Sequence, residues 1–199
     1  MGVTLIASLL SHREVLFESP LDWVSRLTFG MNPFPESLRI AELVKQRTAK
    51  DDRIAVIGSE PQIYFYSHRR SGTGFIYDYA LKENHPLALQ MEEQMKQEVE
   101  RSEPKMLIYI FFRSQSMSVL PADERITDWF VNYVHRSYRK IAVFDITPGD
   151  TAGVSLERAL QNKDPQAKQW ISIYERRDSL STELPQRRET IYSTSSEKD

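Results

Sequence analysis

Three short apolar runs constrain the fold of this 199-residue chain more than any other feature. They lie at residues 53–58, 106–112 and 140–146, and none shows the polar alternation of a half-exposed strand. Such runs are typical of strands that are covered on both faces in a parallel sheet. Segments with helical periodicity precede each run, at residues 35–47, 85–102 and 124–138. This alternation of helical segments and apolar strands along the chain predicts an α/β three-layer sandwich with a mainly parallel, Rossmann-like sheet of about 4–5 strands.

The remaining segments give weaker expectations. Residues 21–29 form a short amphipathic segment, and Pro61 opens a short helix over "PQIYFYS". We expect residues 73–79 to be extended, residues 85–102 to form the longest helix, and Asp123 to cap the helix at 124–138. Met91 and Met95 fit core positions of the longest helix. Residues 169–176 alternate less cleanly, which predicts an edge strand or a late hairpin.

The domain organisation follows from composition along the chain. We expect an N-terminal segment at 1–30, one α/β domain at 31–180 and a flexible polar tail at 181–199. The opening "MGVTLIASLL" lacks the basic region and cleavage site of an intact signal peptide. It fits either a membrane-proximal remnant or an ordinary strand or helix of the domain. No apolar run reaches the ~20 residues that span a bilayer.

Composition excludes several classes of function. The 26 basic and 28 acidic residues give a net charge of −2, without the basic surplus of a nucleic-acid-binding protein. The chain has no cysteine, so disulfides, thiolate metal sites and cysteine nucleophiles are excluded. Its four histidines lie far apart without metal-binding spacing (His12, His68, His85 and His135). We therefore expect neither a metal site nor a cofactor.

The loop Gly58-Ser59-Glu60-Pro61 joins the first apolar run to a helix start. Ligands of open α/β sheets bind at the carboxyl ends of strands, where a helix N-terminus favours anions. However, Glu60 places a negative charge there, and neither GxGxxG nor GxxxxGK[ST] is present. The alternative is that Ser59 or Glu60 caps the helix. GxSxG is also absent, so the sequence predicts no acyl-transfer nucleophile and no catalytic residue.

The residues after this loop complete a candidate binding rim, made of Ser59, Glu60, Tyr64, Arg69, Arg70 and Ser71. The arginines would grip a phosphate or carboxylate, or else lie in a solvated loop or stack on Tyr64 or Tyr66. Asp145 and Asp150 flank "ITPG" and could reach the same rim as Glu60. The local aromatic residues suit either a sugar-stacking wall or, more commonly, the core (Tyr64, Phe65, Tyr66, Phe75, Tyr77 and Tyr79).

Residues 31–112 resemble a known family. The matching features are Asn32-Pro33-Phe34-Pro35-Glu36, "DDRIAVIGSEPQIYFYS" from Asp51, Arg69-Arg70-Ser71, and the helix and strand "MEEQMKQEVERSEPKMLIYI". They resemble the soluble C-terminal region of bacterial GT-C membrane glycosyltransferases, similar to protein O-mannosyltransferases and lipid A aminoarabinose transferases. In this family a glycine is more frequent at the position of His68.

The resemblance implies a non-catalytic domain on the periplasmic face of the inner membrane. In the family a multi-helix membrane region precedes this domain, carries the catalytic acids and uses a polyprenyl-phosphate sugar. The expected partners are therefore that transmembrane region and a carbohydrate or lipid-linked acceptor. Two alternatives remain at this point. One is a stand-alone sugar- or nucleotide-phosphate-binding protein that uses the 58–61 loop with Arg69 and Arg70, and the other is a structural interaction module.

Overall fold

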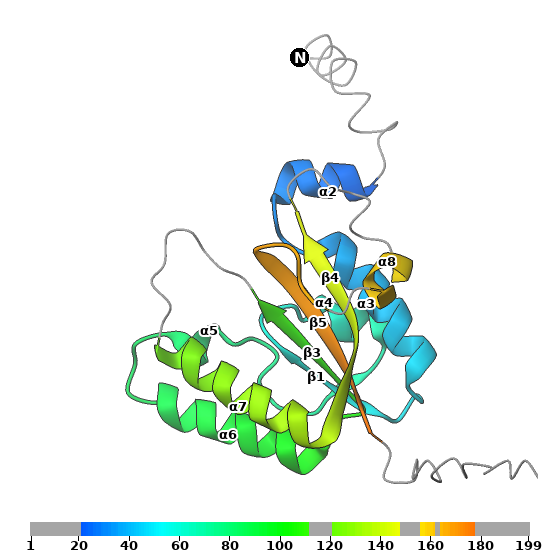
Figure 1. Cartoon of the computed structure of the whole chain (residues 1–199). Coiled ribbons are helices and arrows are strands. Elements are labelled where there is room, and N and C mark those ends of the chain that lie inside the picture. The colour runs from blue at the N-terminus through cyan, green and yellow to red at the C-terminus, as the bar shows by residue number, and fades with distance from the viewer. Residues whose placement is uncertain (1–20, 112–120, 148–155, 162–163, 178–199) are drawn as a thin grey trace, which may run out of the picture.

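The computed structural model describes residues 21–111, 121–147, 156–161 and 164–177 (Figure 1). Its strands are β1 (Arg53–Ile57), β2 (Arg70–Ser71), β3 (Met106–Phe111), β4 (Tyr138–Ile146) and β5 (Gln169–Arg176). Its helices are α2 (Leu21–Phe29), α3 (Phe34–Arg47), α4 (Gln62–Ser67), α5 (Tyr79–Lys82), α6 (Ala88–Ser102), α7 (Pro121–Ser137) and α8 (Leu156–Gln161). Residues 1–20 of the expected N-terminal segment 1–30, the expected tail at 181–199 and Asp150 lie outside the described residues.

The strands form one mixed sheet in the order β2-β1-β3-β5-β4. Strand β1 pairs in parallel with β2 and β3, while β5 runs antiparallel to both of its neighbours, β3 and β4. The α/β class and the three strands predicted from the apolar runs are confirmed. The carboxyl ends of β1, β2, β3 and β4 therefore share one edge of the sheet, which we call the carboxyl edge, and their amino ends share the opposite amino edge.

The position of β5 differs from the sequence-based expectation. The strand does pair antiparallel with β4, but it lies inside the sheet and leaves β4 at the edge. Ile171, Ser172 and Ile173 of β5 are all buried. The polar side chain of Ser172 gives the segment the alternation of a strand with one solvated face, although both faces are covered. The alternation was therefore a misleading signal.

Two apolar clusters cover the two faces of the sheet. Along β1, Ile54 and Val56 belong to one cluster, with residues of α3 and α8, while Ala55 and Ile57 belong to the other, with residues of α6 and α7. Figure 1 shows α3 and α8 on one side of the strands and α6 and α7 on the other. Successive residues of a strand point to opposite faces, so the unbroken apolar sequence of β1 serves both clusters.

Several local predictions were wrong. Residues 73–78 form no strand, because β2 ends at Ser71 and α5 begins at Tyr79. Helix α7, with 17 residues, is longer than α6, with 15. Asp123 lies inside α7, which begins at Pro121, so it is not the cap. By contrast, Met95 is buried in the core and Met91 packs against it, as predicted.

Helix α2 contacts the rest of the domain through charge and aromatic packing. Arg26 forms an ion pair with the fully buried Glu36 in the first turn of α3. The rings of Phe29 and Phe34 meet edge to face, with their centroids 5.1 Å apart. Among the described residues, no helix is both long enough and apolar enough to cross a bilayer.

Candidate functional site at the carboxyl edge

The chain leaves β1 through a glycine that the packing requires. Gly58 has φ +147°, and a Cβ atom built there would lie 2.8 Å from Cβ of Ile110 on β3. Both the backbone conformation and the close approach of β3 therefore favour glycine. This turn brings Ser59 and Glu60 to the carboxyl edge, between β1 and α4. The strand–loop–helix arrangement predicted for residues 53–67 is confirmed.

The predicted binding rim does not form one site. Ser59 and Glu60 lie at the carboxyl edge, whereas Arg70 pairs in register with Arg53, the first residue of β1. Helix α4 carries the chain back toward the amino edge before Arg69. Since a strand rises about 3.3 Å per residue, roughly 13 Å of β1 separates the two groups. The alternative that combined the 58–61 loop with Arg69 and Arg70 therefore lacks a common pocket.

Ser59 links two loops instead of capping a helix. Its hydroxyl donates a hydrogen bond to the carboxylate of Asp78, and the N–H of Asp78 donates back to Oγ of Ser59 at 3.2 Å. Lys82 completes the group with an ion pair to Asp78 at 2.7 Å. Pro61 is the N-cap of α4, which has no side-chain cap. The predicted capping role of Ser59 or Glu60 is therefore wrong.

Glu60 is a buried acid, with only 8% of its surface exposed. Its carboxylate accepts a hydrogen bond from the side-chain amide of Gln62, which also lies 3.1 Å from Oγ of Ser37. Burial raises the pKa of Glu60 to about 6, and the charges of Asp78 and Glu36 contribute in the same direction. The pKa of Glu60 therefore lies well above the ordinary range of a glutamate carboxyl group.

Glu36 is the third acid of this edge. Burial raises its pKa, against the opposing effect of the charge of Arg26. Its Oε2 atom is buried without a hydrogen-bond partner among the described residues. Within the described part of the chain, no three acidic or histidine side chains are arranged to hold a metal ion. The acids of this edge interact chiefly with neighbouring protein groups.

Tyr64 has a structural role at the open side of β1. Its hydroxyl accepts hydrogen bonds from the N–H of Val56 at 2.8 Å and from the hydroxyl of Ser71 at 3.2 Å. Because β2 has only two residues, Val56 lies beyond the reach of its backbone, and Tyr64 satisfies this N–H group. Burial raises the pKa of Tyr64. The residue belongs to the sheet and its core rather than to a ligand-binding surface.

Other aromatic residues of this region are exposed, contrary to the expectation that they belong to the core. Tyr77 is 50% and Tyr79 61% exposed, and their rings stack with centroids 6.0 Å apart and an interplanar angle of 25°. On α4, Phe65 and Tyr66 are exposed and meet edge to face. Phe75 packs partly against the core. The pair Tyr77–Tyr79 flanks Asp78 and so lies beside the Ser59 loop.

The remaining predicted residues lie elsewhere. Arg69 donates hydrogen bonds to Oγ1 and to the carbonyl of Thr48, at 2.8 and 2.9 Å, and thereby fastens the end of α4 to the end of α3. Arg69 therefore does not stack on a tyrosine. Arg70 is exposed and has no side-chain hydrogen bond or ion pair with any described residue. Oγ of Ser71 accepts from the N–H of Thr73 at 3.1 Å.

Asp145 does not join the rim of Glu60. It lies near the carboxyl end of β4, three strand spacings from β1, or about 14 Å across the sheet. Its Oδ1 accepts the N–H groups of Gln166 and Ala167, at 2.9 and 3.0 Å, and thereby holds the entry to β5. Asp145 is thus a structural acid.

Sequence reasoning missed Asp78, Lys82 and Gln62, which complete the carboxyl edge. The one available signal was the pattern Tyr77-Asp78-Tyr79, an acid between two aromatic residues.

Comparison of the chain with protein-family models, with curated proteins and with solved structures gives no significant match.

Proposed function

We propose that this chain is a non-catalytic carbohydrate-binding domain, the soluble extracytoplasmic C-terminal domain of a bacterial GT-C membrane glycosyltransferase. The family assignment rests on the resemblance of residues 31–112. In this proposal the domain is a three-layer, Rossmann-like α/β sandwich. It holds the acceptor for the membrane-embedded catalytic region on the periplasmic side.

The observation that carries the binding role is the exposed Tyr77–Tyr79 pair. Two stacked, exposed tyrosine rings leave a contiguous apolar area in water that a ligand can cover. Here Ser59 and Lys82 hold Asp78 between them, so both rings remain at the carboxyl edge. The apolar C–H face of a sugar ring can pack on such a tyrosine pair, while polar groups of the edge bind its hydroxyls.

The contacts of the two nearest acids favour binding over catalysis. Glu60 and Asp78 are 8% and 9% exposed. Their hydrogen bonds and ion pairs go to Gln62, Ser59 and Lys82. A general acid or base must reach the reacting group of the substrate, within about 3 Å or through one water molecule. In this arrangement neither carboxylate is presented free to a ligand.

The binding role can be tested by titrating the full chain with a panel of oligosaccharides while recording amide chemical shifts. We expect saturable shifts in residues 77–79 and their loss in a Tyr77→Ala/Tyr79→Ala double variant. Phe65→Ala is the matched control, since Phe65 is 72% exposed on the neighbouring helix α4. Oligosaccharide binding that survives the double variant unchanged would contradict the proposed site.

The non-catalytic assignment needs its own measurement. The chain is incubated with polyprenyl-phosphate sugars and candidate acceptors, and the products are analysed by mass spectrometry. We expect no transfer of the sugar. Glycosylated acceptor above the level of a protein-free control would show that the chain carries catalytic residues, and the proposal would then be wrong.

A further inference from the structure

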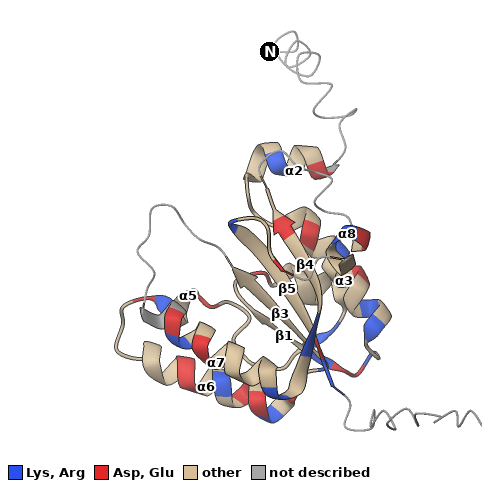
Figure 2. Cartoon of the chain, in the orientation of Figure 1, with Lys and Arg blue, Asp and Glu red and all other residues tan. Residues whose placement is uncertain are grey.

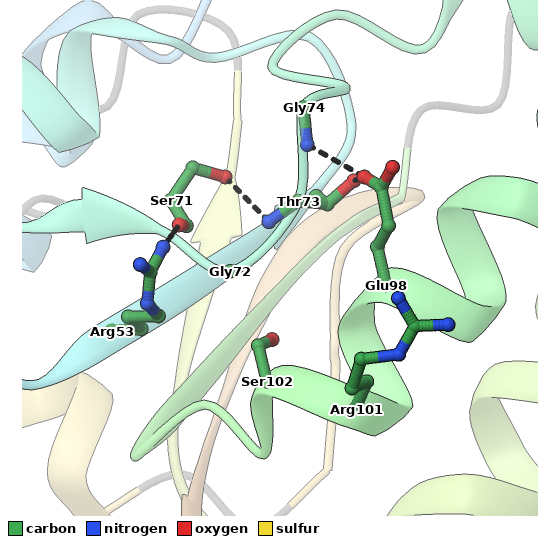
Figure 3. A pocket seen from close by; sticks show the side chains of 8 residues that line it. All are labelled: Arg53, Ser71, Gly72, Thr73, Gly74, Glu98, Arg101 and Ser102. Carbon is green, nitrogen blue, oxygen red and sulfur yellow. Dashed lines mark hydrogen bonds between the residues drawn. The ribbon is translucent and has the colours of Figure 1, made fainter.

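A second polar site lies at the amino edge, on the face of the sheet that α6 covers. It is a surface pocket of about 560 Å³, lined by Arg53, Ser71, Gly72, Thr73, Gly74, Glu98, Arg101 and Ser102 (Figure 3). Arg53 opens β1, Ser71 ends β2 and residues 72–74 follow it, and the other three residues lie on the last turns of α6. The volume is within the range of small-molecule sites, roughly 300–1,000 Å³.

Two arginines line this pocket, one from β1 and one from α6, and a third lies next to the first on β2. Arg53 and Arg101 line it, and Arg70 is the register partner of Arg53 on β2, so the side chains of Arg53 and Arg70 leave the same face of the sheet. Like charges directly across neighbouring strands repel each other. Arg70 and Arg101 are exposed, and neither forms an ion pair or side-chain hydrogen bond with a described residue.

One acid faces these arginines, and it is already engaged. Oε2 of Glu98 accepts hydrogen bonds from the hydroxyl of Thr73 and the N–H of Gly74, both at 2.8 Å, and Oε1 accepts from Gln94 at 2.8 Å. The N–H of Gly74, the largest contribution, and the amide of Gln94 lower the pKa of Glu98. Glu98 thus fixes the loop against α6, as the dashed lines of Figure 3 show. The lining holds two arginines against one glutamate, which leaves an excess of positive charge.

The lining also defines the chemistry of a ligand. It contains no aromatic or aliphatic side chain. The N–H groups of residues 72–74 already donate hydrogen bonds within the protein, so the charged donors of the pocket are its guanidinium groups. Guanidinium groups bind phosphate through paired, charge-assisted hydrogen bonds. We propose that this pocket binds the phosphoryl group of a polar phosphate ester. The inference does not depend on the carbohydrate site, which lies at the other end of β1.

The test is a titration of the full chain, at low ionic strength, with inorganic phosphate and with glucose 1-phosphate. Amide chemical shifts of Gly72, Thr73 and Gly74 are recorded throughout. We expect saturable shifts with the phosphate ester, and affinity reduced roughly tenfold or more in Arg101→Gln, since one charge-assisted contact is lost. Arg39→Gln is the control. It removes an exposed charge from α3, on the opposite face of the sheet, and should leave the affinity unchanged.

A second arm separates a free ester from a lipid headgroup. The chain is mixed with vesicles of an anionic phospholipid, with vesicles of a zwitterionic phospholipid as the reference. Shifts at residues 72–74 with anionic vesicles alone would identify the lipid headgroup as the phosphate source. Two results would overturn the proposal: no shift at residues 72–74 with any probe, or equal weakening in Arg101→Gln and Arg39→Gln.

Discussion

The acids at the carboxyl edge of the sheet and the arginines near the amino-edge pocket differ in their burial and pairing. At the carboxyl edge, Glu36, Glu60 and Asp78 are buried, and each is bonded to a neighbouring side chain. At the amino edge, Arg70 and Arg101 are exposed and form no ion pair with a described residue, although the charge of Arg101 acts on Glu98. The buried Glu175 of this edge is paired with Arg139. Figure 2 shows basic residues at the lower ends of β4 and β5, where β5 also carries the acidic Glu175, and an acidic residue at the tip of β4.

The difference separates residues that stabilise the fold from residues that are available to a ligand. A buried charge destabilises the fold unless it is paired, so changes at the carboxyl edge should alter stability. An exposed charge contributes little to stability and remains free to bind. At the carboxyl edge, Asp78 with its partners Ser59 and Lys82 therefore positions the exposed tyrosines. The arginines near the amino-edge pocket are themselves the expected ligand contacts.

The largest expected effect follows from removing Arg26. Arg26→Leu leaves the carboxyl group of Glu36 buried without its cation, and we expect a loss of about 3–5 kcal/mol in the free energy of unfolding. Urea denaturation at pH 7 measures this loss. The double variant Arg26→Leu/Glu36→Leu removes both charges and should recover most of the stability. A single variant as stable as the wild type would show that α2 does not dock on α3 in solution.

The next largest expected effect is a dependence of folding stability on pH, which comes from Glu60. Its folded-state pKa of about 6 lies above the usual 4.5, so the folded state binds the proton more tightly than the unfolded state. The resulting stabilisation is fully present below pH 4.5 and is lost as the pH rises through about 6. It amounts to about 2 kcal/mol.

Denaturation midpoints measured between pH 4 and pH 7.5 check this contribution. Glu60→Gln mimics the protonated side chain, and the difference between the two proteins cancels the titration of all other groups. We expect the variant to gain stability relative to the wild type as the pH rises. Parallel pH profiles would show that Glu60 is solvated rather than buried.

The smallest expected effect is a change in stability at the amino edge. His68 ends α4 in the left-handed region, with φ 54°, a conformation that costs a non-glycine residue about 1–2 kcal/mol. His68→Gly relieves this cost but adds freedom to the unfolded chain, so we expect a net gain of about 0.5–1 kcal/mol. The matched control is His135→Gly, inside α7, which should lose stability. Thermal unfolding compares the two variants.

Local sequence patterns correctly predicted the strands that are apolar on both faces. The apolar sequences of β1 and β3 predicted buried strands, and Pro61 marked the start of α4. The segment 169–176 was harder to place, because the buried Ser172 imitates a solvated position. Residue 68 adopts a left-handed conformation, which a glycine at this position would have predicted and the histidine did not.

The candidate sites depended far more on tertiary structure. Ser59, Glu60, Arg69 and Arg70 lie within twelve residues, and this proximity predicted a single rim. The short helix α4 between them runs back along β1 and places the two pairs at opposite edges. Conversely, Ser59 and Asp78 lie 19 positions apart and are hydrogen-bonded, and Arg53 and Arg101 line one pocket.

By itself the sequence determined the α/β class and the parallel strand pair β1 and β3. These follow from periodicity and apolar composition, which act over a few residues. Only the tertiary structure decided the place of β5, the burial of the three acids, and which arginines remain unpaired. Strand order and burial depend on contacts between distant segments, and the charge state and availability of a side chain depend on that burial.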